Sequence, residues 1–116
     1  MNQSTEERVA AARARLAELR EKFVDRTQGE LATMRESLAQ LQAGQAAGLG
    51  EILRLAHRMA GTGATLGLDE LSEHARRIEK LAESSPNAAT DADALRTLTA
   101  SIESLAAELS RARSGG

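Results

Sequence analysis

Apolar residues recur at intervals of three and four along most of the chain, which is the spacing of one face of an α-helix. In the first forty residues these positions are Val9, Ala12, Leu16, Leu19 and Phe23, followed by Leu31, Met34, Leu38 and Leu41. A polar interval over 25–30 that contains Gly29 separates the two sets. The pattern predicts one long helix kinked near Gly29, or two consecutive helices, with Ser4 or Thr5 as the N-terminal cap.

Three further helices follow, each bounded by residues that start or stop a helix. One is expected from about 50 to 66, ended by Gly67, and the next begins after Asp69 as its cap and stops before Pro86. The last opens at Asp91 or Asp93 and bears the apolar stripe Leu95, Leu98, Ile102, Leu105 and Leu109. No stretch alternates as a strand would. The fold class predicted is all-α, an antiparallel four-helix bundle with an additional or extended N-terminal helix.

The chain has 116 residues, which is the size of one domain. We expect its core over about 19–110 and a flexible tail over 114–116. Hydrophobic residues make up 41% of the sequence but aromatic residues only 1%, so aliphatic side chains must fill the core. This composition favours helices over sheet.

Charge and cysteine content exclude several classes of protein. The net charge is −2, from 15 basic and 17 acidic residues that are interspersed, so no strong field of one sign attracts nucleic acid or an anionic membrane. The chain has no cysteine and therefore no disulfide or thiolate chemistry. No apolar run is long enough for a membrane span or a signal peptide. We expect a cytoplasmic monomer that binds neither nucleic acid nor membrane.

A histidine stands in the stretch AHRMAGTGATLGL, within the second predicted region of helix. On a helical wheel the apolar residues of this helix, Ile52, Leu55, Ala56, Met59 and Leu66, fall within an arc of about 100°. His57 lies roughly 155° from the centre of that arc, among residues of the outer face. It is therefore predicted to point into solvent, where a neutral imidazole is available as a nucleophile near pH 7.

Gly61 lies one helical turn beyond His57. Glycine inside a helix costs about 1 kcal/mol relative to alanine, so a sequence selected only for stability would not place it there. Its benefit is space, because another molecule can approach the imidazole without meeting a side chain. An ordinary solvated histidine is the alternative, but it leaves this glycine unexplained.

The run LAHRMAGTGATLGLDELSEHARRIEKL resembles the signature of histidine-containing phosphotransfer (HPt) domains. The matching positions are Ala56, His57, Met59, Gly61, Gly67, Leu68, Leu71, Ala75, Ile78 and Glu79. Phe23, Leu31, Met34 and Leu38 are similar to the family's preceding helix, so that the resemblance extends over about 19–109. It implies a four-helix bundle in which His57 accepts a phosphoryl group, on Nε2 by analogy.

The resemblance implies a relay between aspartates of two receiver domains, one in a hybrid histidine kinase and one in a response regulator. Such a protein is a phosphocarrier with no ATP site and no autokinase activity of its own. No carboxylate cluster in the sequence is suited to a metal, so Mg²⁺ is expected on the partner receiver domain. The residues expected to contact a receiver are Leu53, Ala60, Ala64 and Thr65, together with Arg54, Arg58 and Gly61.

The sequence departs from the family pattern at one position near the histidine. Many members have lysine three residues after the histidine, where this chain has Ala60. Arg58 or Arg54 could supply the missing positive charge through charge-assisted hydrogen bonds to phosphate oxygens. The sequence does not decide between these two arginines.

The competing function is a non-catalytic helical adaptor or dimerisation bundle. Its basis is the heptad-like segment from Val9 to Phe23, which extends beyond the family's usual core and can pair with itself or with a partner helix. We favour instead that this segment covers the end of the bundle. A degenerate phosphotransfer domain is disfavoured because His57 and Gly61 are both present.

Overall fold

The computed structural model describes residues 2–114, with side chains described over residues 4–114. Its elements are α1 (Asn2–Gln42), α2 (Gly48–Thr65), α3 (Asp69–Ser84), the short 3₁₀ helix η1 (Ala88–Thr90) and α4 (Ala92–Ser114). Residues 2–114 form no strand, which confirms the all-α prediction. Of the predicted tail, Ser114 ends α4, and the other two positions lie outside the described residues.

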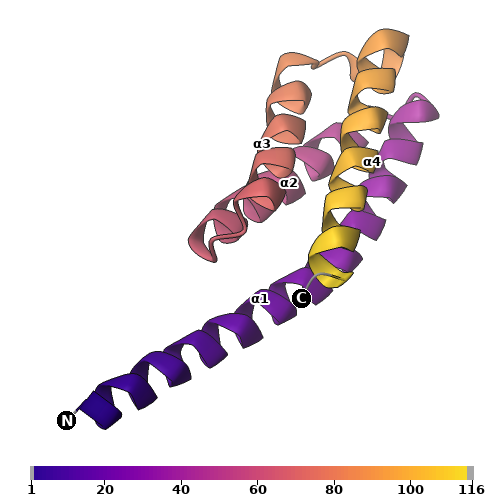
Figure 1. Cartoon of the computed structure of the whole chain (residues 1–116). Helices are drawn as coiled ribbons and strands as arrows, with labels where there is room; N and C mark the ends of the chain where they lie inside the picture. Colours follow the sequence, from indigo (N-terminus) through magenta and orange to yellow (C-terminus); the bar gives the residue numbers. More distant parts are fainter. Residues whose placement is uncertain (1, 115–116) are drawn as a thin grey trace.

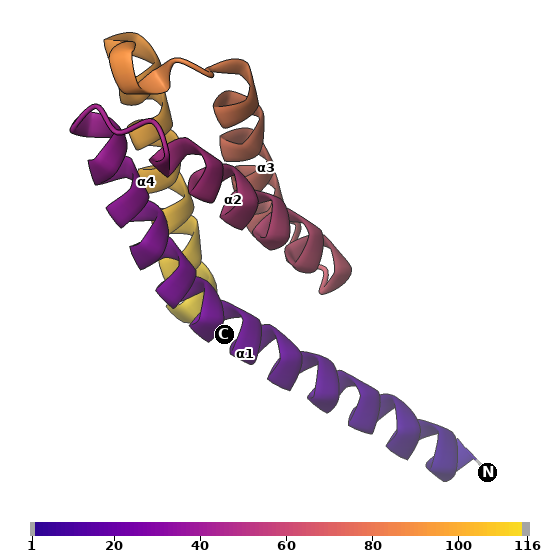
Figure 2. The same ribbon diagram turned by 180° about the vertical axis from the view of Figure 1, so that it is seen from behind.

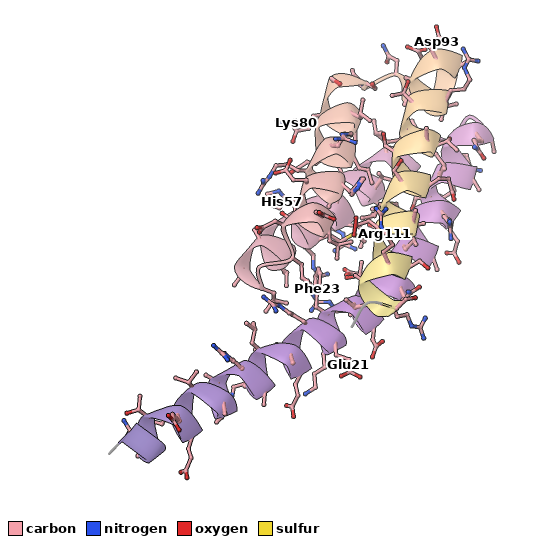
Figure 3. The ribbon with its side chains drawn as sticks, viewed as in Figure 1. Glu21, Phe23, His57, Lys80, Asp93 and Arg111 are labelled. Carbon is pink, nitrogen blue, oxygen red and sulfur yellow. The ribbon has the colours of Figure 1, made fainter. Side chains whose placement is uncertain are left out.

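The four α-helices form a bundle in which chain neighbours run antiparallel (Figures 1 and 2). α1 and α3 each pack against both α2 and α4. The buried aliphatic side chains come from all four helices, and the largest ones that are fully enclosed are Met34, Leu41, Ile52, Met59, Ile78, Leu98, Ile102, Leu105 and Leu109. Phe23, the sole aromatic residue, is 3% exposed and lies at the end of the core where the protruding part of α1 meets the bundle (Figure 3). No helix within residues 2–114 is long and apolar enough to cross a membrane.

The first forty residues form one continuous helix rather than two. Gly29 lies inside α1, and Ser4 and Thr5 also lie within the helix, so neither is its cap. A helix of 41 residues is about 60 Å long, which accounts for the 64 Å long dimension of the molecule. The N-terminal half of α1 extends away from the other helices instead of covering the end of the bundle (Figure 1). Our expectation for this segment is therefore wrong, because Val9 and Leu19 remain 45% and 46% exposed.

The turn between α2 and α3 sets the antiparallel packing of these two helices. Gly67 has φ +74°, the left-handed conformation that glycine adopts without steric cost. The Leu68 amide donates to the Gly63 carbonyl at 2.8 Å and the Gly67 amide to the Ala64 carbonyl at 3.1 Å, which closes the end of α2. Arg20 of α1 donates from Nε to the Leu66 carbonyl at 2.7 Å and so ties the turn to the first helix.

The helix starts agree only in part with the predicted caps. Asp69 is the first residue of α3 and the cap position is Leu68, which makes no side-chain capping bond. Asp91 does cap α4, since its Oδ1 accepts the backbone N–H groups of Asp93 and Ala94, both at 3.1 Å.

Candidate functional site

His57 lies on the solvent-facing side of α2, as its wheel position predicts. The apolar residues on the opposite side, Ile52, Leu55, Ala56 and Met59, are all buried in the bundle core. The His57 side chain is 76% exposed. The bundle therefore fixes the helix that carries the imidazole while leaving the ring accessible to a second molecule.

Glu79 of α3 contacts the imidazole from the neighbouring helix. His57 Nδ1 lies 2.5 Å from Glu79 Oε2, and the Glu79 side chain is only 17% exposed. An ionised carboxylate can only accept a hydrogen bond, so the proton of the pair belongs on Nδ1. In that tautomer Nε2 carries the free lone pair of the ring, and this nitrogen is the nucleophilic one.

Close packing between α2 and α3 brings these two residues together. Ser72 Oγ donates to the Ala60 carbonyl at 2.7 Å in a buried hydrogen bond. A Cβ atom added to Gly63 would lie 3.4 Å from Ser72 Cβ, at the limit of ordinary contact. Glu79 lies two turns beyond Ser72 on the side of α3 that faces α2. On α2, its partner His57 lies three residues before Ala60, the partner of Ser72. Figure 3 shows the imidazole at this edge between the two helices.

The three glycines after His57 have three different surroundings. A Cβ atom at Gly61 would have no atom within 4 Å, and the residue is exposed. Gly63 faces Ser72, and Gly67 makes the turn at its positive φ. Neither packing nor backbone conformation requires glycine at 61, so the open space next to His57 is its distinguishing property.

The two arginines proposed to support a phosphoryl group have unequal partners. Arg54 donates to Glu51 through Nε at 3.2 Å and through a terminal nitrogen at 2.7 Å. This hydrogen bonding lowers the pKa of Glu51 and raises that of Arg54. Arg58 lies 3.9 Å from Glu30 of α1, which is a looser contact. Both side chains are about half exposed, with values of 53% for Arg54 and 49% for Arg58.

The predicted receiver-contacting residues divide into three groups. Ala64 and Thr65 are exposed on α2, and Thr65 Oγ1 donates to the Gly61 carbonyl at 3.0 Å. Leu53 is half-buried. Ala60 is 4% exposed and belongs to the core, which contradicts its predicted place on the contact surface. The reason is that α3 packs against α2 at this position, where buried Ser72 donates to the Ala60 carbonyl.

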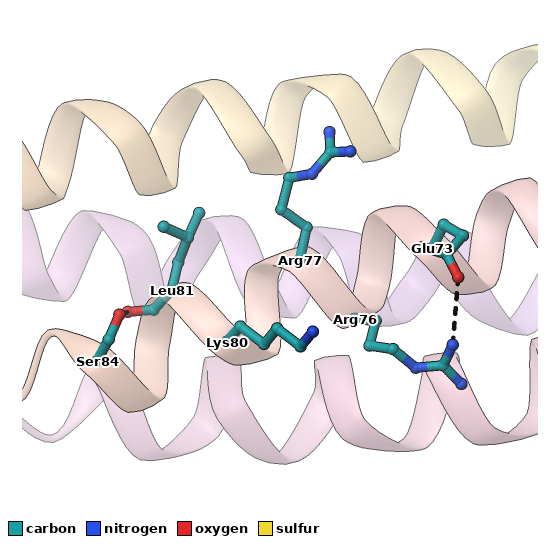
Figure 4. Close-up of a pocket in the computed structure, with 6 residues that line it drawn as sticks. All are labelled: Glu73, Arg76, Arg77, Lys80, Leu81 and Ser84. Carbon is teal, nitrogen blue, oxygen red and sulfur yellow. Dashed lines mark hydrogen bonds and ion pairs between the residues drawn. The ribbon is translucent and has the colours of Figure 1, made fainter.

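A shallow pocket on α3 is lined by Glu73, Arg76, Arg77, Lys80, Leu81 and Ser84 (Figure 4). Arg76 pairs with Glu73 at 3.3 Å, and Arg77 extends toward α4. His57 is not among the lining residues, so this pocket is distinct from the space around the imidazole. Two of the residues that line this pocket, Arg76 and Lys80, are cations close in sequence to Glu79 on α3. Sequence reasoning gave these residues no role.

The contact made by Glu79 is the principal feature that sequence reasoning missed. The sequence signature includes Glu79 but does not indicate a function for it. The available signal was an acidic residue bordering the apolar stripe of α3, between Ala75 and Ala82, where it faces the preceding helix. Wheel positions alone do not give the register between two helices, so the pairing with His57 was not predictable from them.

The model of the family described as Hpt domain matches residues 18–114. The chain belongs to the Hpt domain family. No curated protein and no solved structure matches it significantly. Hpt domains act in phosphotransfer within phosphorelays, and the match covers α2, α3, α4 and the part of α1 from residue 18 onward. It begins at residue 18 and so leaves the protruding first part of α1 outside the family's core.

Over the part of the chain that the structure describes, no three His, Cys, Asp or Glu side chains are grouped so that they could hold a metal ion. His57 and Glu79 form a pair rather than a ligand set. The arrangement that this Hpt domain offers is therefore an oriented imidazole beside a carboxylate.

Proposed function

We propose that this Hpt domain relays a phosphoryl group through His57 between the receiver-domain aspartates of a hybrid histidine kinase and a response regulator. The observation that carries the proposal is the exposed imidazole whose Nδ1 is held by Glu79. An imidazole with no function would not need a half-buried carboxylate to fix its tautomer. The protein is then a phosphocarrier, with neither an ATP site nor autokinase activity of its own.

The chemistry is an in-line displacement at phosphorus. The Nε2 lone pair attacks the phosphorus of the phosphorylated aspartate, the Nε2–P bond forms, and the P–O bond to the aspartate breaks. The aspartate leaves as a carboxylate, and no proton has to depart from the attacking nitrogen. The ring gains positive charge as the bond forms, because Nδ1 keeps its proton. Glu79 lies beside that nitrogen and stabilises the charge. The return step to a second aspartate reverses these bond changes.

Positive charge and space around Nε2 support the transferred group. Arg58 is the better candidate to donate hydrogen bonds to phosphate oxygens, because its contact with Glu30 is loose while Arg54 is held at two nitrogens by Glu51. Gly61 leaves room for the receiver's backbone above the ring. Leu53, Ala64 and Thr65 extend the same face of α2 and complete the proposed contact surface.

The partner receiver would supply the groups that this chain lacks. Phosphoryl transfer needs charge neutralisation on the phosphate oxygens, usually by Mg²⁺. We assign that ion to the receiver domain together with the aspartate. A cytoplasmic location and a monomeric state stay predictions from the sequence.

The experiment is transfer from a receiver domain phosphorylated on its aspartate, in the presence of Mg²⁺, to the native chain and to His57→Gln. The label that reaches the chain should be acid-labile and alkali-stable, as expected for phosphohistidine. His57→Gln should remain folded, because the side chain is exposed, and should accept no label. The chain's other histidine, His74, lies on α3, so His74→Gln is the matched control and should accept label at the native rate. Equal labelling of the native chain and His57→Gln would refute the proposal.

A further inference from the structure

The protruding part of α1 carries an apolar seam that continues from the bundle core. Val9, Ala12, Leu16, Leu19 and Phe23 alternate at intervals of three and four, as the a and d positions of a coiled coil do. Phe23 is buried by the bundle, but every described side chain from Ser4 to Leu19 is exposed except Leu16, which is half-buried. Figure 2 shows this segment leaving the other helices. The seam therefore continues for two heptads beyond the core, with Val9, Ala12 and Leu19 exposed and Leu16 half-buried.

The seam is bordered on both sides by positive charge. With Val9 and Leu16 at a, the e and g positions between 8 and 22 are Arg8, Arg13, Arg15, Arg20 and Lys22. All five are basic, while Glu18 and Glu21 lie at c and f, away from the seam. Within the described part of the chain, Arg8, Arg13 and Arg15 form no ion pair. The charge along this border is thus available to a partner.

This charge pattern argues against a second copy of the chain as the partner. In a parallel pair each g position faces an e position of the other helix, and in an antiparallel pair g faces g and e faces e. Either arrangement would place arginines and lysine opposite one another along the whole of residues 8–22. Like charges at these positions oppose pairing. A helix with acidic residues at its e and g positions would instead form ion pairs with the cations Arg8, Arg13 and Arg15, which are unpaired within residues 4–114.

The width of the apolar surface argues against a lipid surface. Helices that lie in a membrane interface present a broad apolar face, commonly with tryptophan, phenylalanine or leucine. Here the apolar side chains larger than alanine, Val9, Leu16 and Leu19, lie only at a and d positions, and the other exposed apolar residues of the segment are alanines, which are too short to insert into a lipid interface. A narrow stripe with charged borders is the pattern of a helix–helix interface.

We propose that residues 8–22 of α1 are a docking site for an amphipathic helix of another protein, with an apolar a/d seam and acidic e and g positions. The two helices would form a short two-stranded coiled coil that continues the bundle's own packing. Because α1 is continuous from Asn2 to Gln42, a helix docked there extends from the bundle in a fixed direction. The proposal is independent of phosphotransfer at His57, and it gives this Hpt domain a second attachment point.

The test uses the full chain and a labelled synthetic peptide of three heptads, with Ile at a, Leu at d and Glu at every e and g position. Binding is followed by fluorescence anisotropy at low ionic strength. Two matched peptides serve as controls: one has Lys at e and g, and the other keeps Glu there but has Ser at a and d. We expect the first peptide to bind, with affinity that falls as salt rises, and neither control to bind.

Two variants locate the site on α1. Leu16→Gln should weaken binding of the acidic peptide because it places a polar group in the seam. The triple variant Arg8→Glu, Arg13→Glu, Arg15→Glu should lose about tenfold or more in affinity for it and should gain affinity for the Lys peptide. Circular dichroism checks that both remain helical. Phosphotransfer to His57 should be unchanged in both, which separates failure of this proposal from failure of the relay.

Four results would overturn the proposal. The first is no binding of the acidic peptide, and the second is equal binding of the acidic and Lys peptides. The third is dimerisation of the chain alone through this segment, measured by sedimentation equilibrium. The fourth is binding to vesicles of phosphatidylglycerol and phosphatidylcholine that the triple variant loses, which would identify the segment as a membrane-surface helix.

Discussion

His57 on α2 and Glu79 on α3 are joined by a contact of 2.5 Å between Nδ1 and Oε2. The two residues are 22 positions apart, and the Gly67 turn between their helices brings them side by side. The carboxylate is largely covered while the imidazole is exposed, so the pair holds one ring nitrogen and presents the other. This relationship connects the fold of the bundle to its proposed chemistry.

Substitution at Glu79 should alter the imidazole tautomer and slow transfer. Glu79→Ala removes a charge-assisted hydrogen bond of about 1.5–3 kcal/mol, so we expect transfer about 10- to 100-fold slower. Glu79→Gln keeps an acceptor oxygen for the Nδ1 proton but loses the negative charge. Its transfer rate should lie between the rates of the native chain and of Glu79→Ala. ¹⁵N NMR of the histidine ring should show the Nδ1–H form in the native chain and a mixture in Glu79→Ala. An unchanged tautomer and an unchanged rate in Glu79→Ala would show that the contact has no role.

Side chains other than proline should be compatible with the fold at position 61, but only small ones should allow phosphotransfer. Nothing lies within 4 Å of an added Cβ, so Gly61→Ala should raise the free energy of unfolding by up to about 1 kcal/mol through helix propensity. Gly61→Gln should fold but block the receiver's approach to Nε2. Gly29→Gln is the matched control, because Gly29 is also helical and unobstructed but lies on α1. Equal transfer by the two Gln variants would contradict the role assigned to Gly61.

Arg58 should matter more to transfer than Arg54. We expect Arg58→Ala to slow transfer by about tenfold, the size of one charge-assisted hydrogen bond, and Arg58→Lys to recover part of the loss. Arg54→Ala should have a smaller effect, because Glu51 already holds that guanidinium. Single-turnover transfer from a phosphorylated receiver gives the rates, and circular dichroism confirms folding. A larger loss in Arg54→Ala would reverse the assignment.

The pair of Arg54 and Glu51 should give a pH dependence of its own. The hydrogen bond from Arg54 lowers the pKa of Glu51 below its ordinary value of 4.5. A lowered carboxyl pKa in the folded state adds stability at pH values above 4.5, and this stability is lost as the pH falls through the folded pKa. In Arg54→Ala the pKa of Glu51, followed by ¹³C NMR, should rise toward 4.5. An unchanged titration would mean that the pair is not formed in solution.

Most of the fold was predictable from the spacing of apolar residues, because that spacing reports which face of each helix is buried. Ile52, Leu55 and Met59 are buried and His57 is exposed for this reason. The positive φ of Gly67 was likewise predictable from its place after the last apolar residue. These features depend on local sequence alone.

Other features depend on how the helices are aligned with one another, which a single sequence does not report. The pairing of Glu79 with His57 and the burial of Ala60 against α3 are of this kind. The free N-terminal half of α1 is another case, because its apolar seam predicts a packing partner without indicating whether the same chain provides it. The structure shows that α2, α3 and α4 leave Val9 and Leu19 uncovered.

The proposed docking of a helix and the proposed relay are compatible in this molecule. His57 and its neighbours lie on α2 and α3, while the apolar seam and its basic borders lie on the protruding part of α1. A helix bound at residues 8–22 would therefore leave the imidazole accessible. It would raise the local concentration of a receiver attached to the same partner.

In the proposed mechanism, Nε2 of His57 accepts the phosphoryl group while Glu79 holds Nδ1. The most direct measurement is ¹⁵N–³¹P correlation NMR of the chain, labelled with ¹⁵N-histidine and phosphorylated by a receiver domain. We expect one phosphorylated ring, His57, with phosphorus coupled to Nε2 and the proton retained on Nδ1. Phosphorus coupled to Nδ1 of His57, or phosphate found on His74, would contradict it.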